Sequence, residues 1–437
     1  MTSRTEIAKY RKENLLLRKQ TEERTGKSVD QLYAERAKRV RDAIELREPD
    51  RVPFSILVEP HAYSGIPNSA AYYDPISLKR TMRKMAVDLE PDMAEAGFPS
   101  CGDAMTELDV QNFVWPGGPK PPDYEFQFIE GEYMKADEYD MFLNDPSGFM
   151  IRRYLPRVYG ALMPLAKLPP LDSMFMGLEG LTPLFASPEF RKMAKHLARA
   201  GKHVAEFRKS IGDTYEELAE LGFPPFARFA PGGVGGAPFD ILTSFLRGMK
   251  GSMLDMYRQP DKLIRACELI LERRIAHSTP ADPTEKDYPP RVGMPLWRGD
   301  PVFMSEDQFK KFYWPGLKKS LQIHVDLGYV PVPFFEAAFG DRLACLLELP
   351  KGKILASIEA SDAVRAKEIL GGHTSLLVRV PNTSKLWSVG QLESFVKDLI
   401  DQCGKNGGLI IVMKMPGKAR IEDMQAMMKS VSEYGRY

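Results

Sequence analysis

Short apolar runs that end in a polar residue recur along the last third of the chain. Three such runs occupy residues 330–336, 353–359 and 375–382. The polar residues that end them are Glu336, Glu359 and Asn382. Short continuous apolar runs between turn residues are typical of parallel strands that are covered on both faces. The pattern therefore predicts buried parallel strands, each followed by a helix.

Strand and helix patterns alternate over most of the chain. Residues 51–59 predict a first strand that ends at Glu59, with His61 just beyond it. Between about residues 65 and 180 the pattern loosens, and an elaborated loop region is expected there. Alternating strands and helices favour a parallel sheet or a closed ring of eight such units. We therefore expect an α/β fold of the (β/α)8 TIM barrel type.

The first 48 residues depart from this alternation. They are charged and helical in pattern, with Gly26 separating two helices and Ser28 or Asp30 as the cap of the second. The pattern predicts a helical N-terminal arm, residues 1–48, followed by one barrel domain, residues 49–437. The arm either clamps the barrel or forms a dimer contact.

Carboxylates at successive strand ends point to a functional site. In parallel α/β folds ligands bind at the carboxyl ends of the strands, and barrel enzymes draw catalytic residues from several strand ends. We expect Glu336 and Glu359 to be catalytic and to converge with Glu59. The candidates for substrate binding are Glu59, His61, Arg298, Asp300, Asn382, Gly235 and Gly236.

Some of these candidates also have a purely structural interpretation. Arg298 can hold a substrate carboxylate in its guanidinium fork, or it can pair with an aspartate such as Asp300 and fix the loop. Gly235 and Gly236 belong to a glycine-rich turn that can line a pocket with backbone N–H groups. The same glycines can instead serve a tight turn where backbone segments approach closely.

Composition restricts the class of function. The 60 basic and 59 acidic residues leave a net charge of +1, so no overall field attracts nucleic acid or an anionic membrane. No apolar run approaches the roughly 20 residues that span a bilayer, and the N-terminus lacks the apolar segment of a secretory signal. The four cysteines are far apart and show no zinc or redox spacing. We expect a cytoplasmic protein with ordinary thiols.

A zinc site is not favoured by the residues at the strand ends. Catalytic zinc takes three ligands from His, Cys and carboxylate. Glu336 and Glu359 have no Cys or His beside them, and Met413 and Met415 offer thioethers, which are poor ligands for such an ion. Glu336, Glu359 and His61 are the weak candidates for a metal site.

Several short motifs together resemble the uroporphyrinogen decarboxylase superfamily. They occupy residues 230–238, 257–260, 303–315, 328–331, 335–336, 349–352, 366–371 and 433–435. The likeness covers residues from about 50 to 437 and is strongest after residue 225. The resemblance implies a (β/α)8 barrel with its site in a cleft at the carboxyl ends of the strands.

The chain departs from both well-understood branches of that superfamily. Uroporphyrinogen decarboxylases carry an arginine-rich segment after the first strand, whereas residues 58–63 here contain no arginine. The corrinoid-dependent methyltransferases hold zinc with a His-x-Cys pair and a later Cys. Those positions are here Phe334, Glu336 and the region 413–415. The chain most resembles relatives with the Phe-Glu strand end, which are found beside corrinoid proteins and for which the resemblance implies demethylation of ethers or amines.

The leading hypothesis is therefore a methyltransferase that acts on a small methylated ether or amine. The chain has no Asp-x-His-x-x-Gly signature of a corrinoid module, so the methyl acceptor would be a corrinoid (cobalamin) carried on a separate protein. Two alternatives stay open. One is a decarboxylase or other lyase that acts on a small carboxylate held by Arg298, and the other is a barrel that binds a ligand without catalysis. A homodimer is also expected, since closed twofold dimers are the commonest assembly.

Overall fold

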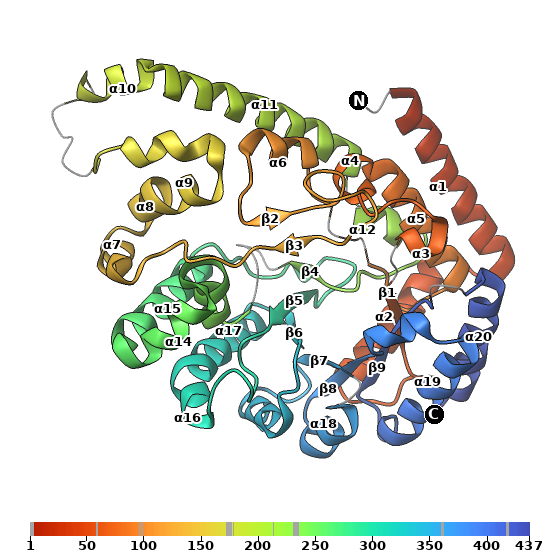
Figure 1. Cartoon of the computed structure of the whole chain (residues 1–437). Coiled ribbons are helices and arrows are strands. Elements are labelled where there is room, and N and C mark those ends of the chain that lie inside the picture. The colour runs from red at the N-terminus through yellow and green to blue at the C-terminus, as the bar shows by residue number, and fades with distance from the viewer. Residues whose placement is uncertain are drawn as a thin grey trace.

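A curled parallel sheet forms the centre of the molecule in the computed structural model (Figure 1). The structure describes residues 4–57, 60–95, 97, 99–171, 177, 179–212, 214–229, 236–359, 362–416 and 419–437. The sheet has seven strands in the order β1-β9-β8-β7-β6-β5-β4, and every neighbouring pair runs parallel. The strands are β1 (Phe54–Leu57), β4 (Arg228–Phe229), β5 (Arg291–Leu296), β6 (Val330–Phe335), β7 (Leu355–Glu359), β8 (Ser375–Arg379) and β9 (Leu409–Lys414).

A two-residue segment lies between the edge strands β1 and β4. Met93 bridges Ser55 of β1, and Ala94 bridges Pro225, just ahead of β4, both in parallel register. The Phe226 N–H donates to the Ala94 carbonyl oxygen at 2.9 Å. The fold is thus a barrel-like α/β architecture around a curled sheet, and the complete (β/α)8 barrel stays a prediction.

Helices make up most of the remaining structure, and many of them pack around the outer side of the sheet (Figure 1). In the N-terminal half they are α1 (Arg4–Thr25), α2 (Val29–Ile44), α3 (Pro60–Ser64), α4 (Ala70–Tyr73), α5 (Pro75–Leu89), α6 (Gly102–Leu108), α7 (Tyr139–Asn144), α8 (Pro146–Phe149), α9 (Leu155–Val158), α10 (Thr182–Ala186), α11 (Pro188–Ile211) and α12 (Thr214–Ala219). In the C-terminal half they are α13 (Pro238–Ile241), α14 (Gly248–Arg258), α15 (Pro260–Ile275), α16 (Glu306–Gln308), α17 (Trp314–Asp326), α18 (Ala363–Leu370), α19 (Val389–Cys403) and α20 (Ile421–Tyr434).

Shorter elements connect these helices. Five-residue and six-residue π-helical stretches are η2 (Met150–Tyr154), η5 (Leu242–Arg247) and η6 (Phe309–Tyr313). The 3-10 segments are η1 (Ala136–Glu138), η3 (Gly160–Lys167), η4 (Glu179–Leu181), η7 (Gly340–Glu348) and η9 (Asn382–Leu386). A separate antiparallel pair joins β2 (Phe113–Val114) to β3 (Gln127–Phe128). None of the helices in the described part of the chain is long and apolar enough to cross a membrane.

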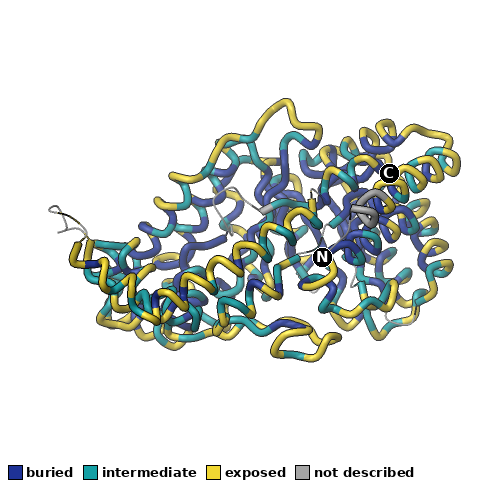
Figure 2. The backbone as a smooth tube through the Cα atoms, turned by 90° about the horizontal axis from the view of Figure 1, so that it is seen from above, coloured by how far each residue is buried: buried dark blue, intermediate teal, exposed yellow. Residues whose placement is uncertain are grey.

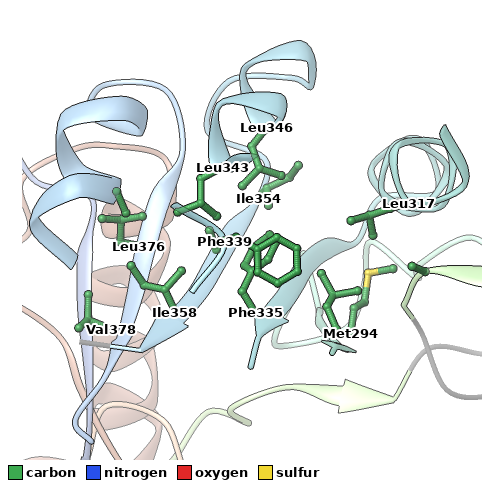
Figure 3. Close-up of a cluster of buried hydrophobic side chains, with 14 of the residues drawn as sticks. Met294, Leu317, Phe335, Phe339, Leu343, Leu346, Ile354, Ile358, Leu376 and Val378 are labelled. Carbon is green, nitrogen blue, oxygen red and sulfur yellow. The ribbon is translucent and has the colours of Figure 1, made fainter. Parts of the chain in front are cut away.

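Side chains of each strand alternate between two hydrophobic layers, because successive residues of a strand point to opposite faces. Phe335 of β6, Ile358 of β7 and Val378 of β8 point outward into a hydrophobic layer that also contains Leu317 of α17 and Leu343 of η7 (Figure 3). The inner layer contains Val332, Leu355, Leu377, Ile410, Val412, Met93 and Phe226. Buried positions accordingly gather along the middle of the molecule and exposed ones along its outer helices (Figure 2).

The N-terminal arm packs on the barrel of its own chain. The Ser28 hydroxyl caps α2, as predicted, and Gly26 has φ +66°, in the left-handed region that glycine accommodates. Val40, Ala43 and Ile44 of α2 pack against the strand residues of the inner hydrophobic layer and belong to it. The apolar face of α2 therefore needs no second subunit, and the homodimer stays a prediction.

The region expected to be an elaborated loop between residues 65 and 180 contains a regular helix. Helix α5 is 15 residues long and is capped by Asp74, whose side chain accepts a hydrogen bond from the Ser77 N–H. It buries an amphipathic stripe that includes Ile76, Leu78, Met82, Met85 and Leu89. The prediction of a loop was wrong here because lysines and arginines interrupt the apolar spacing, and two of them, Lys79 and Arg83, are buried with partners distant in sequence.

Candidate active site

Two carboxylates lie side by side at the carboxyl ends of β6 and β7. Phe334 pairs with Ser357 and Phe335 pairs with Ile358, so the next positions along the two strands are Glu336 and Glu359. Neighbouring strands lie about 4.8 Å apart, so these glutamates are neighbours on the inner face of the sheet. The structure thus brings together the two residues that the sequence marked as catalytic. The third carboxylate expected with them, Glu59, lies outside the described residues.

Two cations extend this row along the next strands. Arg379 ends β8 in register with Glu359, and Lys414 ends β9. The Arg379 Nε donates to the buried Ser357 hydroxyl at 3.0 Å, and its guanidinium carbon lies 4.0 Å from the centre of the Phe334 ring. The Lys414 ammonium donates to the side-chain oxygen of Asn382, the amide predicted to bind substrate.

A further carboxylate, Glu95, follows the segment that bridges β1 and β4. It is half-buried, and removal of water raises its pKa to about 7, although the charges of Arg379 and Lys414 act in the opposite direction. We call the set formed by Glu95, Glu336, Glu359, Arg379 and Lys414 the strand-end cluster. Its members come from five positions around the curled sheet.

The strand-end cluster shifts the pKa of its own carboxyls upward. Desolvation by the surrounding protein raises the pKa of Glu336 and of Glu359, and the charge of Glu359 adds to the effect on Glu336. Arg379 opposes both shifts, while its own pKa is lowered because it is removed from water. A carboxyl whose pKa is raised toward neutrality can donate a proton at physiological pH, as general acid catalysis requires.

Asp240 fixes the end of β5 next to the cluster. Its buried carboxylate accepts hydrogen bonds from the Arg298 N–H at 3.0 Å, the Trp297 N–H at 3.3 Å and the Tyr313 hydroxyl at 2.7 Å. Burial raises the pKa of Asp240 to about 7 despite these three donors. Asp240 therefore fixes the backbone at Trp297 and Arg298, and with it the position of the Arg298 side chain at the end of the sheet.

Arg298 and Asp300 are engaged in separate interactions. Arg298 forms an ion pair with Glu130, a residue of the excursion between β3 and α7. The Asp300 carboxylate accepts from the Val302 N–H at 2.8 Å and from the Phe303 N–H at 3.2 Å, which closes the turn after β5. Arg298 therefore does not pair with Asp300, and substrate binding by these two residues stays a prediction.

The other predicted residues are dispersed. His61 lies in α3, is exposed, and its Nδ1 is 4.0 Å from the Asp123 carboxylate. Gly236 has φ +125°, and a Cβ there would lie 2.8 Å from the Pro295 carbonyl oxygen, so glycine is needed for close approach to β5. Gly235 lies outside the described residues. Within the described ranges, no three His, Cys, Asp or Glu side chains are grouped to hold a metal ion.

Arg379, Lys414, Glu95 and Asp240 are the residues that sequence reasoning missed. Arg379 and Lys414 carried a signal, because each is a charged residue near the end of an apolar run that was read as a strand. Glu95 carried none, since the bridging segment before it is only two residues long. Asp240 looked like an ordinary first-turn carboxylate of a helix.

Comparison with known proteins supports the fold. No family model matches the chain, and no curated relative matches it. Among solved structures, the fold is similar to that of a methyltransferase from Methanosarcina mazei, with 14% sequence identity and a TM-score of 0.52. The similarity covers 91% of this chain and 98% of the other. At this identity the likeness concerns the fold.

Proposed function

We propose that the chain is a methyltransferase that moves a methyl group from a small methylated ether or amine to a corrinoid carried on a separate cytoplasmic protein. The observation that carries the proposal is the pair of adjacent glutamates, Glu336 and Glu359, at the strand ends of a fold similar to a methyltransferase. Both carboxyls have raised pKa values, which suits proton donation to a leaving heteroatom.

Glu336 is the proton donor in this proposal. The methyl carbon leaves its oxygen or nitrogen, the electron pair of that bond stays on the heteroatom, and the heteroatom takes the proton of Glu336. Desolvation keeps the pKa of Glu336 high, and the negative charge of Glu359 adds to the effect. A corrinoid held by the partner protein would supply the nucleophile that accepts the methyl group.

Exposed apolar side chains beside the strand ends suit an approaching partner protein. Val302, in the turn after β5, is 98% exposed, and Leu386, in η9 after β8, is 88% exposed. Tyr257 at the end of α14 is 78% exposed, and its hydroxyl accepts a hydrogen bond from the Gln308 side chain. Exposed apolar residues on the loops around a site are a common mark of a protein contact.

Zinc does not fit the donor set near Glu336. Met413 and Met415 belong to the outer hydrophobic layer, on the side of the sheet away from the strand-end cluster. The residues beside Glu336 are Glu359 and Arg379, and a guanidinium repels a metal cation. We therefore assign no step to zinc, and the proton of Glu336 takes its place as the electrophile.

The same proposal includes the complete (β/α)8 barrel as residues 49–437, with residues 1–48 as an arm. The bridges of Met93 to Ser55 and of Ala94 to Pro225 support a very short eighth strand position between β1 and β4. A short strand at this position would bring Glu95 to the same rim as the other strand-end residues.

The test is methyl transfer to cob(I)alamin with the native chain and Glu336→Gln over a panel of small methyl ethers and methylamines. Glutamine keeps the shape of the side chain but cannot donate an acidic proton, so we expect the rate to fall roughly 10²–10⁴-fold. Glu368→Gln, on the exposed face of α18, is the matched control and should keep native turnover. Native rates in Glu336→Gln would exclude its role as the acid, and carboxyl loss catalysed by the chain alone would favour a lyase.

A further inference from the structure

The strand-end cluster and its neighbour Arg298 contain three cations, and two of them have a near partner. Arg298 is ion-paired with Glu130, and the Lys414 ammonium is hydrogen-bonded to Asn382. Arg379 differs from both. Among the described residues, no carboxylate forms an ion pair with its guanidinium, and Glu95, Glu359 and Glu336 act on it only through their charges.

The Arg379 side chain is nevertheless held in one orientation. Its Nε donates to Ser357, its guanidinium stacks on Phe334, and the ring of Phe226 lies 5.9 Å from the guanidinium carbon on a neighbouring part of the inner layer. These contacts use the Nε–H and the faces of the planar group. They leave the four N–H bonds of the two Nη atoms without a hydrogen-bond acceptor among the described residues.

The Arg379 guanidinium is half-buried, and its Nη groups remain available to a ligand. Removal from water lowers the pKa of Arg379, and the charges of Glu95, Glu359 and Glu336 compensate only from beyond ion-pair distance. A planar guanidinium with free Nη groups matches the two oxygens of a carboxylate in a bidentate arrangement. The raised pKa values of the nearby glutamates reduce the negative charge that an incoming anion would meet.

We propose that Arg379 binds the carboxylate of the substrate, so the substrates are small methylated carboxylic acids. That the substrate carries a methyl group rests on the proposed function. That it carries a carboxylate rests on Arg379 alone. Arg379 and Glu336 are separated by one strand, β7, which places their backbones roughly 10 Å apart. The Arg379 guanidinium crosses β7 and stacks on Phe334, two residues before Glu336 on the same face of the sheet. We therefore expect the methylated heteroatom within a few bonds of the carboxylate, as in a 2-methoxy or 2-methylamino acid.

The test is equilibrium binding of methoxyacetate and of its neutral analogue methoxyacetamide to the full chain, measured by calorimetry without the corrinoid protein. We expect the native chain to bind the acid more tightly than the amide. Arg379→Gln should weaken binding of the acid roughly 10–100-fold, the value of a hydrogen-bonded charge, and should leave binding of the amide unchanged. Arg379→Lys keeps the charge but loses the planar guanidinium. Its affinity for the acid should therefore lie between those of the native chain and Arg379→Gln.

Arg365→Gln is the matched control, because it removes the same charge from an exposed arginine on α18. Native affinity for methoxyacetate in Arg379→Gln, equal affinity of the native chain for acid and amide, or no saturable binding of the acid would each overturn the proposal. Should Arg379→Gln fail to fold, the acid–amide comparison on the native chain and Arg379→Lys decides the question. Loss of acid binding in Arg379→Gln without methyl transfer by the native chain would uphold this site and reject the methyltransferase.

Discussion

At the scale of single residues, Asp240 is a buried acid that organises the rim of the sheet without belonging to the strand-end cluster. It receives three hydrogen bonds, two of them from the backbone that leaves β5. Its pKa is raised from 3.8 to about 7, since burial outweighs the three donors. The folded chain therefore holds a proton on Asp240 at pH values where the unfolded chain has released it.

This pKa shift predicts a loss of stability as the pH rises. Between the unfolded pKa and the folded pKa the native state binds more protons, so the contribution of Asp240 to the free energy of unfolding falls from about pH 4 to about pH 7 and is constant above that. The total is at most about 4 kcal/mol, because one pKa unit corresponds to about 1.4 kcal/mol. Urea unfolding at several pH values should show a flatter profile for Asp240→Asn than for the native chain.

The exposed Asp326 provides the comparison for that experiment. Asp326→Asn removes the same group from the surface of α17 and should keep the native pH profile. Parallel profiles for Asp240→Asn and the native chain would show that Asp240 is ionised in the folded state.

At the scale of elements, the two faces of β7 contribute to different parts of the molecule, the candidate site and the outer hydrophobic layer. Ser357 and Glu359 face the interior, where they support Arg379 and Glu336. Ala356 and Ile358 face the outer hydrophobic layer. Alternation along one strand thus couples the position of the candidate site to the packing of the helices.

Truncation of Ile358 tests this coupling. Ile358 is 1% exposed and packs in the outer layer (Figure 3), so Ile358→Ala should lower the free energy of unfolding by about 2–5 kcal/mol through lost burial and a cavity. Val364→Ala on the exposed side of α18 should change it by less than about 0.5 kcal/mol. Equal stability of both variants in chemical denaturation would contradict the buried position of β7.

At the scale of the whole molecule, a buried ionic network fastens the N-terminal arm to the barrel. Arg39 of α2 and Arg51 ahead of β1 both pair with Asp92, at 2.5 and 2.7 Å, and Asp92 also accepts from the Phe54 N–H. Asp92 is fully buried, yet its pKa is lowered because the two arginines outweigh the loss of water. The network joins the arm, β1 and the start of the bridging segment.

Removal of Asp92 should therefore loosen the whole assembly. Asp92→Ala leaves two arginines without their shared partner, and we expect a loss of about 3–5 kcal/mol in the free energy of unfolding and faster proteolysis of the arm. The native contribution of Asp92 is present above its unfolded pKa and is lost as the pH falls through its folded pKa. Asp30→Ala breaks the exposed pair with Lys286 and should leave the free energy of unfolding nearly unchanged, because surface pairs contribute little. A similar cost for both variants would mean that the network does not hold the arm.

The sequence by itself determined the parallel strands, several helix starts and the pair Glu336 and Glu359. Strand runs and caps are local signals: the apolar stretches of β6 to β8 and the Ser28 cap depend on residues next to one another. The two glutamates could be paired from sequence because each ends a strand, and strand ends of a parallel sheet meet at one edge.

Only the tertiary structure decided which charged residues pair with each other. Arg298 and Glu130 are 168 residues apart, so their pairing could not be read from spacing. The bridging role of Met93 and Ala94 likewise depends on strands far away in the chain. The spacing of apolar residues predicts only the neighbours of a residue on its own helix or strand. The ion-pair partner of a charged residue and the surface against which a helix packs depend on how distant elements come together.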